Sequence, residues 1–573
     1  MSETRPTVMG TRGAITTSNY MATSAGYEIL LAGGNAIDAS IAAGFVLHVV
    51  EPHMSGVGGE TPILLYSARK RRIFAISGQG SAPKAATLDF FQGNGITLIP
   101  GDGLLPATVP ASFDAWITCL MLFGTMTLGE VIAPAIRLAE EGFPVYTALH
   151  QNVMLHAKRF LSEWPTTARI YLPRGRVPRI GEVLRQNELA KTLRSLTEAE
   201  RRVGNDREKG LEAARRYFYE GPIARKIAKF AAQRSFKDAT GKYHNGLITL
   251  EDLVDYKTRL EETVNIVYKG LTVHKCGPWS QGPVLLQQLR LLEDYDLRRL
   301  RHNSADYIHL ITEASKLAFA DREAFYGDPL YTDVPLTRLL SRHYSRKRKK
   351  LIDMRNASLT LQPGSRPHVP VAESTAFHAG DTTHLDAVDS DGNMVSATPS
   401  GGWIWSSPVI EGLGFSLGTR GQMFSLDAAH PNCIAPGKRP RTTLSPSLIS
   451  SKGRPVLAFG TPGGDQQDQW ALQFFLNFVE FGMGLQGAID APSFHNQHFP
   501  SSLYPRKAEP GSLYVEGRIP SGIVNELRSR GHNVIVQGDW VNGRMTAVHY
   551  DWENHVVSAA ASSRYQIAYA LAH

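Results

Sequence analysis

Cysteine is scarce in this chain, and the usual marks of a metal site are missing. Three cysteines occur in 573 residues: Cys119, Cys276 and Cys433. They are odd in number and far apart, with no CxxC pair, so we expect neither a disulfide framework nor a cysteine-ligated zinc site. The histidines His48, His53 and His384 do not show the spacing of metal ligands either. The sequence therefore predicts no metal and no cofactor.

Long apolar runs are also absent. No stretch of the chain approaches the roughly 18 to 20 apolar residues of a membrane-spanning helix. The N-terminal sequence MSETRPTVMGTRG lacks the apolar core of a secretory signal. We therefore expect a cytoplasmic protein with no membrane partner.

Nucleotide and nucleic-acid signatures are missing as well. The glycine-rich stretches match neither a P-loop nor a dinucleotide-binding fingerprint. Lys and Arg total 61 against 53 Asp and Glu, a formal net charge of +8, and part of the excess lies in the run RKRKK at 346–350. A basic run without interleaved aromatic residues is more typical of a solvated surface than of a nucleic-acid site. No nucleic-acid partner is expected.

What the chain does contain is a series of strong helix signals. Four helices are predicted in its first quarter: 19–34, 35–50, 112–124 and 127–142. Asn35, Ser112 and Thr127 are the expected N-caps of the last three. Residues from about 150 to 260 are helical and charged, which suits an outer layer. The segment from about 330 to 380 is basic and rich in Pro and Ser, and we expect an exposed linker or a mobile loop there.

One hairpin stands apart from these helices. The stretch DTTHLDAVDSDGNMVSATPS, residues 381–400, alternates with period two around an Asp/Gly/Asn turn, which predicts two antiparallel strands. Its first strand begins on a threonine pair that follows Asp381. A cut before Thr382 would give one residue both a hydroxyl nucleophile and a free α-amine. The alternative is that the pair is simply two β-branched residues in a sheet.

An N-terminal threonine is chemically well suited to attack an amide carbonyl. Its hydroxyl is a weak nucleophile at neutral pH and needs a base, and an α-amine has a reference pKa of about 7.7 to 8.0, close to the operating pH. The same hydroxyl can attack the carbonyl of Asp381 before cleavage, so that water opens the resulting ester. The chain would then make its own active site.

A second glycine-rich turn is a candidate for stabilising the oxyanion of such an attack. In GTPGGD, Gly463 and Gly464 lie between a predicted strand and the helix from about Gln466. Backbone N–H groups at a helix N-terminus are good donors to a developing negative charge. The alternative is a glycine turn that backbone geometry alone requires. The same two interpretations apply to SGVGG, where clustered glycines allow a close approach to a ligand or to another strand.

Seven motifs occur together in a distinctive order. They are GGNAIDASIAAGF, SGVGG, TVPASFDAW with FGTMTLGEVIAPAIRLAEEGFPV, FADREAFYGDP, DTTHLDAVDSDGN, KRPRTTLSP and GTPGGD. In this order and spacing the chain resembles the gamma-glutamyltransferase family of N-terminal-nucleophile hydrolases, from about residue 8 to 570. The resemblance implies an α/β fold of the four-layer αββα sandwich type. It also implies self-cleavage between Asp381 and Thr382.

The resemblance assigns parts to the two fragments. It implies a large subunit, 1–381, that includes the linker at about 330–381, and a small subunit, 382–573, which stay associated as one composite domain. It implies Thr382 as nucleophile, its α-amine as base, Ser400 as a supporting hydroxyl, and Gly463 and Gly464 as oxyanion donors. The remaining implied substrate contacts are Thr442 and Thr443, which stand where the family often has paired serines on the substrate carboxylate.

Three departures affect the site that would hold a free glutamate end. Gln79 stands where the family has an arginine for the α-carboxylate, and loss of a guanidinium removes the strongest kind of carboxylate contact. Gly402 replaces an asparagine, and Ser425 replaces an acidic residue, although Asp427 is two positions away. Arg441 and Arg420 are alternative contacts for the substrate carboxylate, although we expect each to face solvent. Gln422, beside Arg420, is a further candidate substrate contact.

These departures favour an amide substrate other than glutathione. Trp403 and Trp405 in GGWIWSSP are interpreted as an aromatic wall for a different acyl group, or as core packing. Water or an amine would resolve the acyl-enzyme. Two alternatives stay open, a true glutathione hydrolase and transpeptidase, and an uncleaved binding protein without catalysis. A homodimer is also left open.

Overall fold

Two large antiparallel sheets lie face to face in the computed structural model, which describes residues 3–364, 382–565 and 567–573. The first sheet, in spatial order, contains β1 (Val8–Gly10), β20 (Val556–Ala561), β19 (Thr546–Asp551), β15 (Arg454–Gly460), β14 (Ser447–Ser451), β11 (Leu271–Lys275) and β10 (Val264–Tyr268). The second contains β21 (Tyr569–Ala572), β2 (Gly13–Thr17), β12 (Leu385–Asp389), β13 (Met394–Ala397), β3 (Ile63–Ser67), β4 (Arg72–Ile76) and β9 (Leu260–Glu261).

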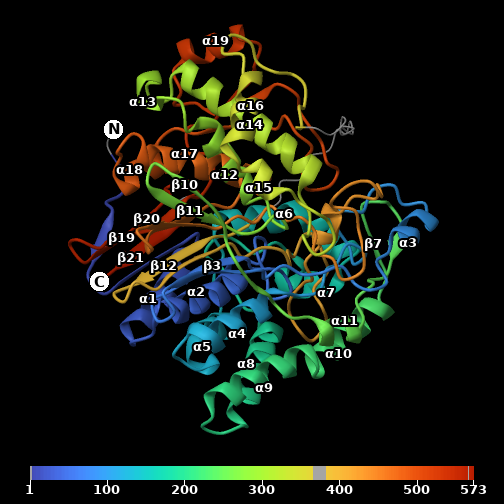
Figure 1. The fold of residues 1–573 in the computed structure, drawn as a ribbon. Coiled ribbons are helices and arrows are strands. Elements are labelled where there is room, and N and C mark those ends of the chain that lie inside the picture. The colour runs from blue at the N-terminus through green and yellow to red at the C-terminus, as the bar shows by residue number, and fades with distance from the viewer. Residues whose placement is uncertain (1–2, 365–381, 566) are drawn as a thin grey trace.

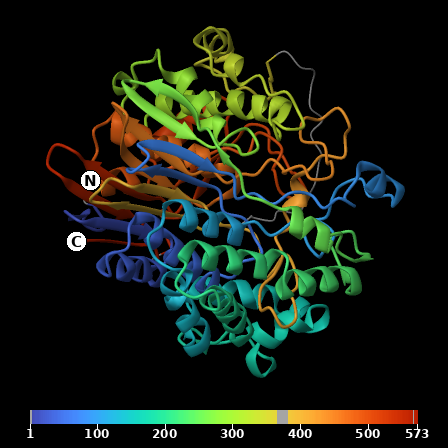
Figure 2. The same cartoon turned by 60° about the horizontal axis from the view of Figure 1, so that its bottom comes forward.

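Three apolar clusters show that the molecule has four layers. Alternate residues of a strand point to opposite faces of its sheet. In β12, Val388 packs between the sheets, whereas Leu385 and Ala387 pack against α1 (Tyr20–Leu31) and α2 (Ala36–Val50). On the far side, Phe459 of β15 packs against α12 (Pro283–Leu292), α14 (Ala305–Phe325) and α17 (Gln467–Val479). Figures 1 and 2 show both sheets between these two helical layers, which confirms the predicted αββα sandwich.

The predicted hairpin lies at the centre of the second sheet. β12 and β13 pair with each other in the register Leu385 to Ala397, β12 pairs with β2, and β13 pairs with β3. The hairpin is buried on both faces. Regular pairing begins at Leu385 rather than at the threonine pair, because Thr382 forms only an isolated bridge with Ser400.

Local helix signals were accurate except at one cap. Asn35 caps α2 in a capping box with Asp38, and Thr127 does the same for α5 (Leu128–Glu141) with Glu130. The predicted cap Ser112 is instead the first residue of α4 (Ser112–Phe123). Its hydroxyl lies 2.8 Å from Nε2 of His48 and 2.6 Å from the Thr61 hydroxyl, so a tertiary contact replaces the local cap.

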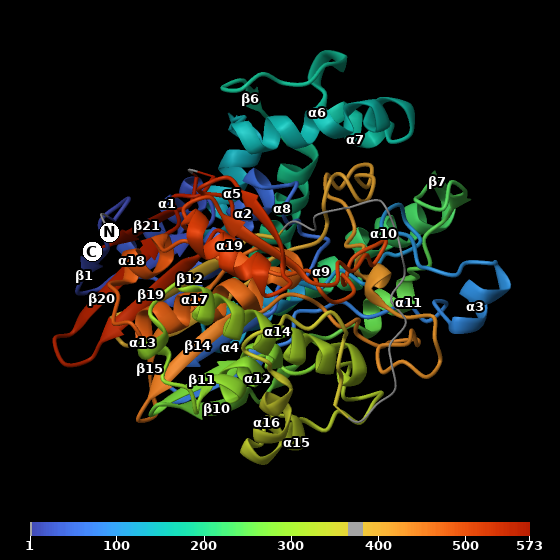
Figure 3. The same ribbon diagram turned by 90° about the horizontal axis from the view of Figure 1, so that it is seen from above.

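The charged region that follows forms an outer helical layer, as expected. It consists of α6 (Thr147–Ser162), α7 (Pro165–Tyr171), α8 (Asn187–Arg201), α9 (Arg207–Tyr219), α10 (Pro222–Gln233) and α11 (Leu250–Asp255). Figure 3 shows α6 and α7 standing out from the body of the molecule. None of the helices in the described ranges has the length and apolar character needed to cross a bilayer.

Part of the segment expected to be a linker is helical. It contains α15 (Leu336–Leu339) and α16 (Arg342–Arg348), and the basic run closes α16. Arg348 is buried 3.6 Å from Asp321, whereas Lys349 is half-buried and forms an ion pair with Asp294. Residues 365–381, which include the predicted cleavage residue Asp381, lie outside the described residues.

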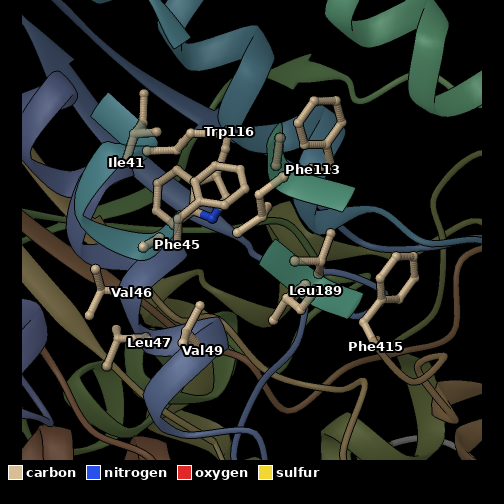
Figure 4. Packing of buried hydrophobic residues seen from close by; sticks show 14 of the residues in the cluster. Ile41, Phe45, Val46, Leu47, Val49, Phe113, Trp116, Leu189 and Phe415 are labelled. Atoms are coloured by element: carbon tan, nitrogen blue, oxygen red, sulfur yellow. The ribbon is translucent and has the colours of Figure 1, made fainter. Parts of the chain in front are cut away.

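Close packing around α2 gives a first prediction. Gly44 lies in the middle of this buried helix, and a Cβ atom there would come within 2.4 Å of Cζ2 of Trp116, which Figure 4 shows in the cluster with Phe45. We expect Gly44→Ala to lower the free energy of unfolding by about 1–3 kcal/mol, because the core cannot accept the extra methyl group without strain.

Urea denaturation of the two proteins measures this effect. Gly93 ends the helix α3 (Leu88–Gly93), and a Cβ there would meet nothing within 4 Å. Gly93→Ala is the matched control and should be neutral or stabilising by up to about 1 kcal/mol. Equal behaviour of the two variants would contradict the packing argument.

Candidate active site

Thr382 and Ser400 bring two hydroxyl groups together where the central hairpin opens. The two residues form an antiparallel bridge, and their Oγ atoms are 3.1 Å apart. Both side chains are buried, at 1% and 0% exposure. The family resemblance implied Ser400 as a supporting hydroxyl, and the structure brings its side chain into contact with that of Thr382. A hydroxyl so close to another can donate to it or accept from it, so each can influence where the proton of the other lies.

Ser400 also contacts an arginine that the sequence placed at the surface. Arg420 is 1% exposed, and its Nη2 donates to Ser400 Oγ at 2.5 Å. Its Nε donates to the carboxylate of Glu60, and its guanidinium lies 4.8 Å from the ring centroid of Trp403. The prediction of a solvent-facing Arg420 was therefore wrong. With these partners the guanidinium is committed to the protein interior rather than to a substrate carboxylate.

A second buried arginine contacts the backbone of Thr382. Arg544 Nη2 donates to the Thr382 carbonyl oxygen at 3.0 Å, and its Nη1 lies 3.7 Å from Glu51. Burial raises the pKa of the Glu51 carboxyl, while Arg544, Thr383 and Asn19 oppose that rise. Sequence reasoning missed both charged residues, since neither stands in a local pattern that marks a site.

A polar network between the sheets fixes the strand that follows Thr382. His384 Nδ1 lies 2.9 Å from Thr398 Oγ1, and its Nε2 lies 3.1 Å from Asp386. Asp386 in turn accepts hydrogen bonds from Ser396 and Thr546, each at 2.7 Å. Because every member is buried and hydrogen-bonded, the network holds the hairpin rigidly beside Thr382.

The turn at Gly463 and Gly464 has the two properties expected of it. The φ angles are +132° and +56°, and a Cβ on Gly463 would come within 2.2 Å of Trp470, so this residue must be glycine. Within the described chain, no hydrogen bond uses the N–H of either residue. The turn precedes a short 3₁₀ segment, Gly464–Gln466, and then α17. It therefore presents free donors at a helix entrance.

A cavity of about 450 Å³ opens onto this turn. Arg544 and His53 line it, so Arg544 connects the cavity wall to the Thr382 carbonyl, although Thr382 is not among the described lining residues. Much of the remaining wall is apolar or aromatic: Leu155, Trp470, Phe499, Leu503, Val541 and Tyr565. Burial and the nearby Arg544 lower the pKa of His53 to about 3, so this ring is neutral at physiological pH.

The residues predicted to hold a substrate do not gather at this cavity. The six are Gln79, Gly402, Gln422, Ser425, Thr442 and Thr443, and none is among the described residues that line it. Gln422 donates to the carbonyls of Gly101 and Thr419 and accepts from the N–H of Tyr504, so its amide is fully used within the protein. Gln79 is buried and belongs to the wall of a different hollow, which Asp255 also lines.

The others are held by backbone contacts or buried in the interior. Gly402 has φ +63°, and a Cβ there would lie 3.1 Å from the N of Gly59, so the clustered glycines serve an approach between two backbone segments. Ser425 is half-buried and pairs through its backbone with Asn432 and Ile434. Thr442 donates its N–H to the Trp279 carbonyl, and Thr443 is buried beside it.

The other residues considered in the sequence analysis as substrate contacts are also bound within the protein or lie away from the cavity. Arg441 is 2% exposed and donates to Glu323 at 2.8 Å, so its predicted solvent-facing position was wrong. Asp427 is exposed at the surface. Trp403 and Trp405 stack with centroids 4.8 Å apart in the interior and donate to the backbone carbonyls of Met54 and His53. They support the cavity wall from behind.

One group of possible metal ligands occurs among the described residues, away from this cavity. Ligand atoms of His309, Glu313 and His532 lie within 4.8 Å of one another. The two imidazoles are already hydrogen-bonded to each other at 2.8 Å, and Glu313 binds Lys316 at 2.6 Å. Nδ1 of His532 has no hydrogen-bond partner among the described residues, and the group lies outside the wall of the cavity, so we assign it no part in the chemistry.

Known proteins similar to this chain were found by sequence and by structure. A family model described as gamma-glutamyltranspeptidase matches residues 22–571. The glutathione hydrolase-like YwrD proenzyme of Bacillus subtilis (strain 168) is 33% identical over 559 residues, which cover 96% of this chain and 97% of that protein. The solved structure of LmbA2991HD is 45% identical, with a TM-score of 0.95 and 100% of both chains covered. The cephalosporin acylase from Bacillus halodurans is 31% identical, with a TM-score of 0.86, covering 100% of this chain and 98% of that one.

Proposed function

This chain belongs to the gamma-glutamyltranspeptidase family of hydrolytic enzymes, and on that premise we propose that Thr382 is the nucleophile of an amidohydrolase with a substrate other than glutathione. The observation that carries the proposal is the buried contact of 3.1 Å between the hydroxyls of Thr382 and Ser400. A reacting hydroxyl needs a fixed direction and a nearby polar group, and this contact supplies both.

The nucleophile would be released by cleavage between Asp381 and Thr382. The cut would give a large subunit, 1–381, and a small subunit, 382–573. Their association has a physical basis, because β12 and β13 of the small subunit lie between β2 and β3 of the large one. The YwrD relative is itself described as a proenzyme, which supports the same maturation here.

The proposed reaction uses the groups around Thr382 in sequence. The Thr382 hydroxyl attacks the amide carbonyl carbon while the α-amine accepts its proton. The N–H groups of Gly463 and Gly464 then stabilise the negative oxygen of the tetrahedral intermediate. The amine leaving group departs with a proton from the α-amine, and water or a second amine resolves the acyl-enzyme.

The cavity favours an amide with a bulky apolar group. Nine of the described residues that line it are apolar or aromatic, and Lys507 adds a cation to its wall. By contrast, Gln79 and Gly402 stand where the family has contacts for a free glutamate end. The similarity to a cephalosporin acylase supports an amide substrate with an acyl group larger than γ-glutamyl. The cytoplasmic location and a homodimer stay predictions.

Mass spectrometry and an amide panel test this proposal together. Denatured protein should give two species, the smaller beginning Thr-Thr-His-Leu. Phenylacetyl-p-nitroanilide should then be hydrolysed with a kcat/KM at least about tenfold higher than that of γ-glutamyl-p-nitroanilide, a difference of about 1.4 kcal/mol in transition-state binding. A single uncleaved species without turnover would contradict the enzymatic proposal. Preference for the γ-glutamyl compound would contradict the substrate class alone.

A further inference from the structure

We propose that a second hollow, lined by Arg5, Trp540 and Tyr565, is a substrate subsite that binds an aromatic amine carrying a carboxylate. The inference rests on the proposed function, because it concerns the part of the amide that leaves after Thr382 attacks. The hollow has a volume of about 540 Å³. That volume is within the range of about 300 to 1,000 Å³ that is typical of sites for small ligands.

The hollow adjoins the cavity that contains the oxyanion donors. Ala148, Gln151 and Tyr565 line both of them. The Tyr565 ring centroid lies 5.5 Å from the guanidinium carbon of Arg544, and Nη2 of that arginine donates to the Thr382 carbonyl. A substrate whose reacting carbonyl lies at the glycine turn can therefore extend past Tyr565 into the hollow.

The two spaces differ in how open they are to solvent. Phe499 and Leu503, in the wall of the first cavity, are 2% and 5% exposed. Trp540 and Tyr565, in the wall of the hollow, are 37% and 57% exposed. The acyl group stays bonded to the enzyme until the second step, whereas the amine leaves after the first. We therefore assign the acyl group to the buried cavity and the amine to the open hollow.

The two aromatic rings of the hollow are held in place by other residues. The guanidinium of Arg518 lies 3.4 Å from the ring centroid of Trp540, and Arg518 is itself paired with Glu516. Tyr565 has a φ of +63°, which is uncommon for a bulky residue, and its hydroxyl donates to the Val541 carbonyl at 3.4 Å. Rings that are both held and partly exposed are suited to contact a planar aromatic group.

Arg5 gives the hollow its charge. It is half-buried, and it is the only charged residue among the described residues that line the hollow. Its Nη1 donates to the Ala568 carbonyl, and within the described ranges Nε and Nη2 have no hydrogen-bond partner and the guanidinium forms no ion pair. By contrast, Lys507 of the first cavity is paired with Glu509 at 2.7 Å. The Nε and Nη2 edge of Arg5 can therefore hold a carboxylate with two parallel hydrogen bonds.

Two amides that differ only in charge test this assignment. They are p-phenylacetamidobenzoate and p-phenylacetamidobenzamide, which share the acyl group and the ring, and chromatography measures the release of each amine. In the wild type, kcat/KM should be at least about tenfold higher for the carboxylate, chiefly through a lower KM. Arg5→Gln should remove this preference and leave kcat/KM for the carboxamide within about twofold. Equal values for the two amides in the wild type would overturn the proposal.

Two further variants separate the charged contact from the aromatic one. Arg12 is an exposed arginine that lines neither space, so Arg12→Gln is the matched control and should keep the full preference for the carboxylate. Trp540→Leu should raise KM for both amides by a similar factor, about three- to tenfold, because both keep the ring. Loss of the preference in Arg12→Gln, or an unchanged KM in Trp540→Leu, would contradict the subsite.

The proposed function and the subsite fail in different ways. Turnover of both amides with equal kcat/KM would refute the subsite alone. Absence of turnover with any amide, phenylacetyl-p-nitroanilide included, would refute the proposed function. In that case p-phenylacetamidobenzoate is a stable ligand, and calorimetry on wild type and Arg5→Gln still decides the subsite. The Kd should be at least about tenfold higher in the variant, and equal affinities would refute the role of Arg5.

Discussion

Replacement of Thr382 by alanine is expected to abolish both cleavage of the chain and turnover of any amide substrate. The change removes the only hydroxyl that the proposal uses as a nucleophile. Loss of the nucleophile of an acyl-transfer enzyme lowers kcat by about 10⁴-fold or more, even when the oxyanion donors are intact. The variant should therefore appear as one species by mass spectrometry and show no activity above background.

Thr382→Ser is the control for this experiment. It keeps the hydroxyl and the distance to Ser400 while removing one methyl group, so it should still cleave and turn over, at a reduced rate. Equal loss in both variants would point to damaged packing rather than to a missing nucleophile. Activity surviving in Thr382→Ala would show that another group performs the reaction.

The elements around this nucleophile were predictable where the signal is local. Period-two alternation and an Asp/Gly/Asn turn define the hairpin within 20 residues, and the Asn35 and Thr127 capping boxes each span four. The turn at Gly463 and Gly464 was also predictable as a turn, because paired glycines at a strand-to-helix junction indicate backbone with a positive φ. Each of these patterns reflects a hydrogen bond or a burial direction set by near neighbours in the chain.

The charged contacts of Thr382 and Ser400 were not predictable in the same way. Arg420 lies 360 residues from Glu60 in the sequence, and Arg544 lies 162 residues from Thr382. An arginine in a glycine-rich loop is exposed in most proteins, and only the folded chain shows that a distant carboxylate and a Trp ring receive it. The predicted N-cap at Ser112 was wrong for a related reason, because its hydroxyl contacts the side chain of His48 instead of a backbone N–H of its own helix.

The substrate contacts show a different limit. Resemblance identified what is missing at Gln79 and Gly402, but a missing contact does not reveal what fills its place. At Gly402 it is the backbone of Gly59, 3.1 Å from where a Cβ would stand. The cavity beside Gly463 is built from segments that are far apart in the sequence, including those of Leu155 and Tyr565. No single sequence motif therefore predicts it.

The second large effect is expected from Arg544→Met. This change removes the donor to the Thr382 carbonyl and leaves Glu51, which is 0% exposed, without a cation. Removal of one partner from a buried ion pair typically costs about 3–5 kcal/mol of folding free energy. We therefore expect a large fall in the urea midpoint together with slower cleavage at Thr382.

The pH dependence of this loss distinguishes an unpaired carboxylate from lost packing. Burial raises the pKa of Glu51 in the folded protein, and Arg544 is the largest opposing influence, so removing it raises that pKa further. A carboxyl whose folded pKa lies above its unfolded value is better tolerated when protonated, and stability is lost as the pH rises through the folded pKa. The deficit of Arg544→Met should therefore shrink as the pH is lowered.

Neutralising the carboxylate provides the matched control. In Glu51→Gln/Arg544→Met the buried charge is gone, so most of the stability should return and the deficit should no longer depend on pH. Cleavage should stay slow in the double variant, because the Thr382 carbonyl still lacks its donor. Full recovery of cleavage with stability would mean that Arg544 serves only to neutralise Glu51.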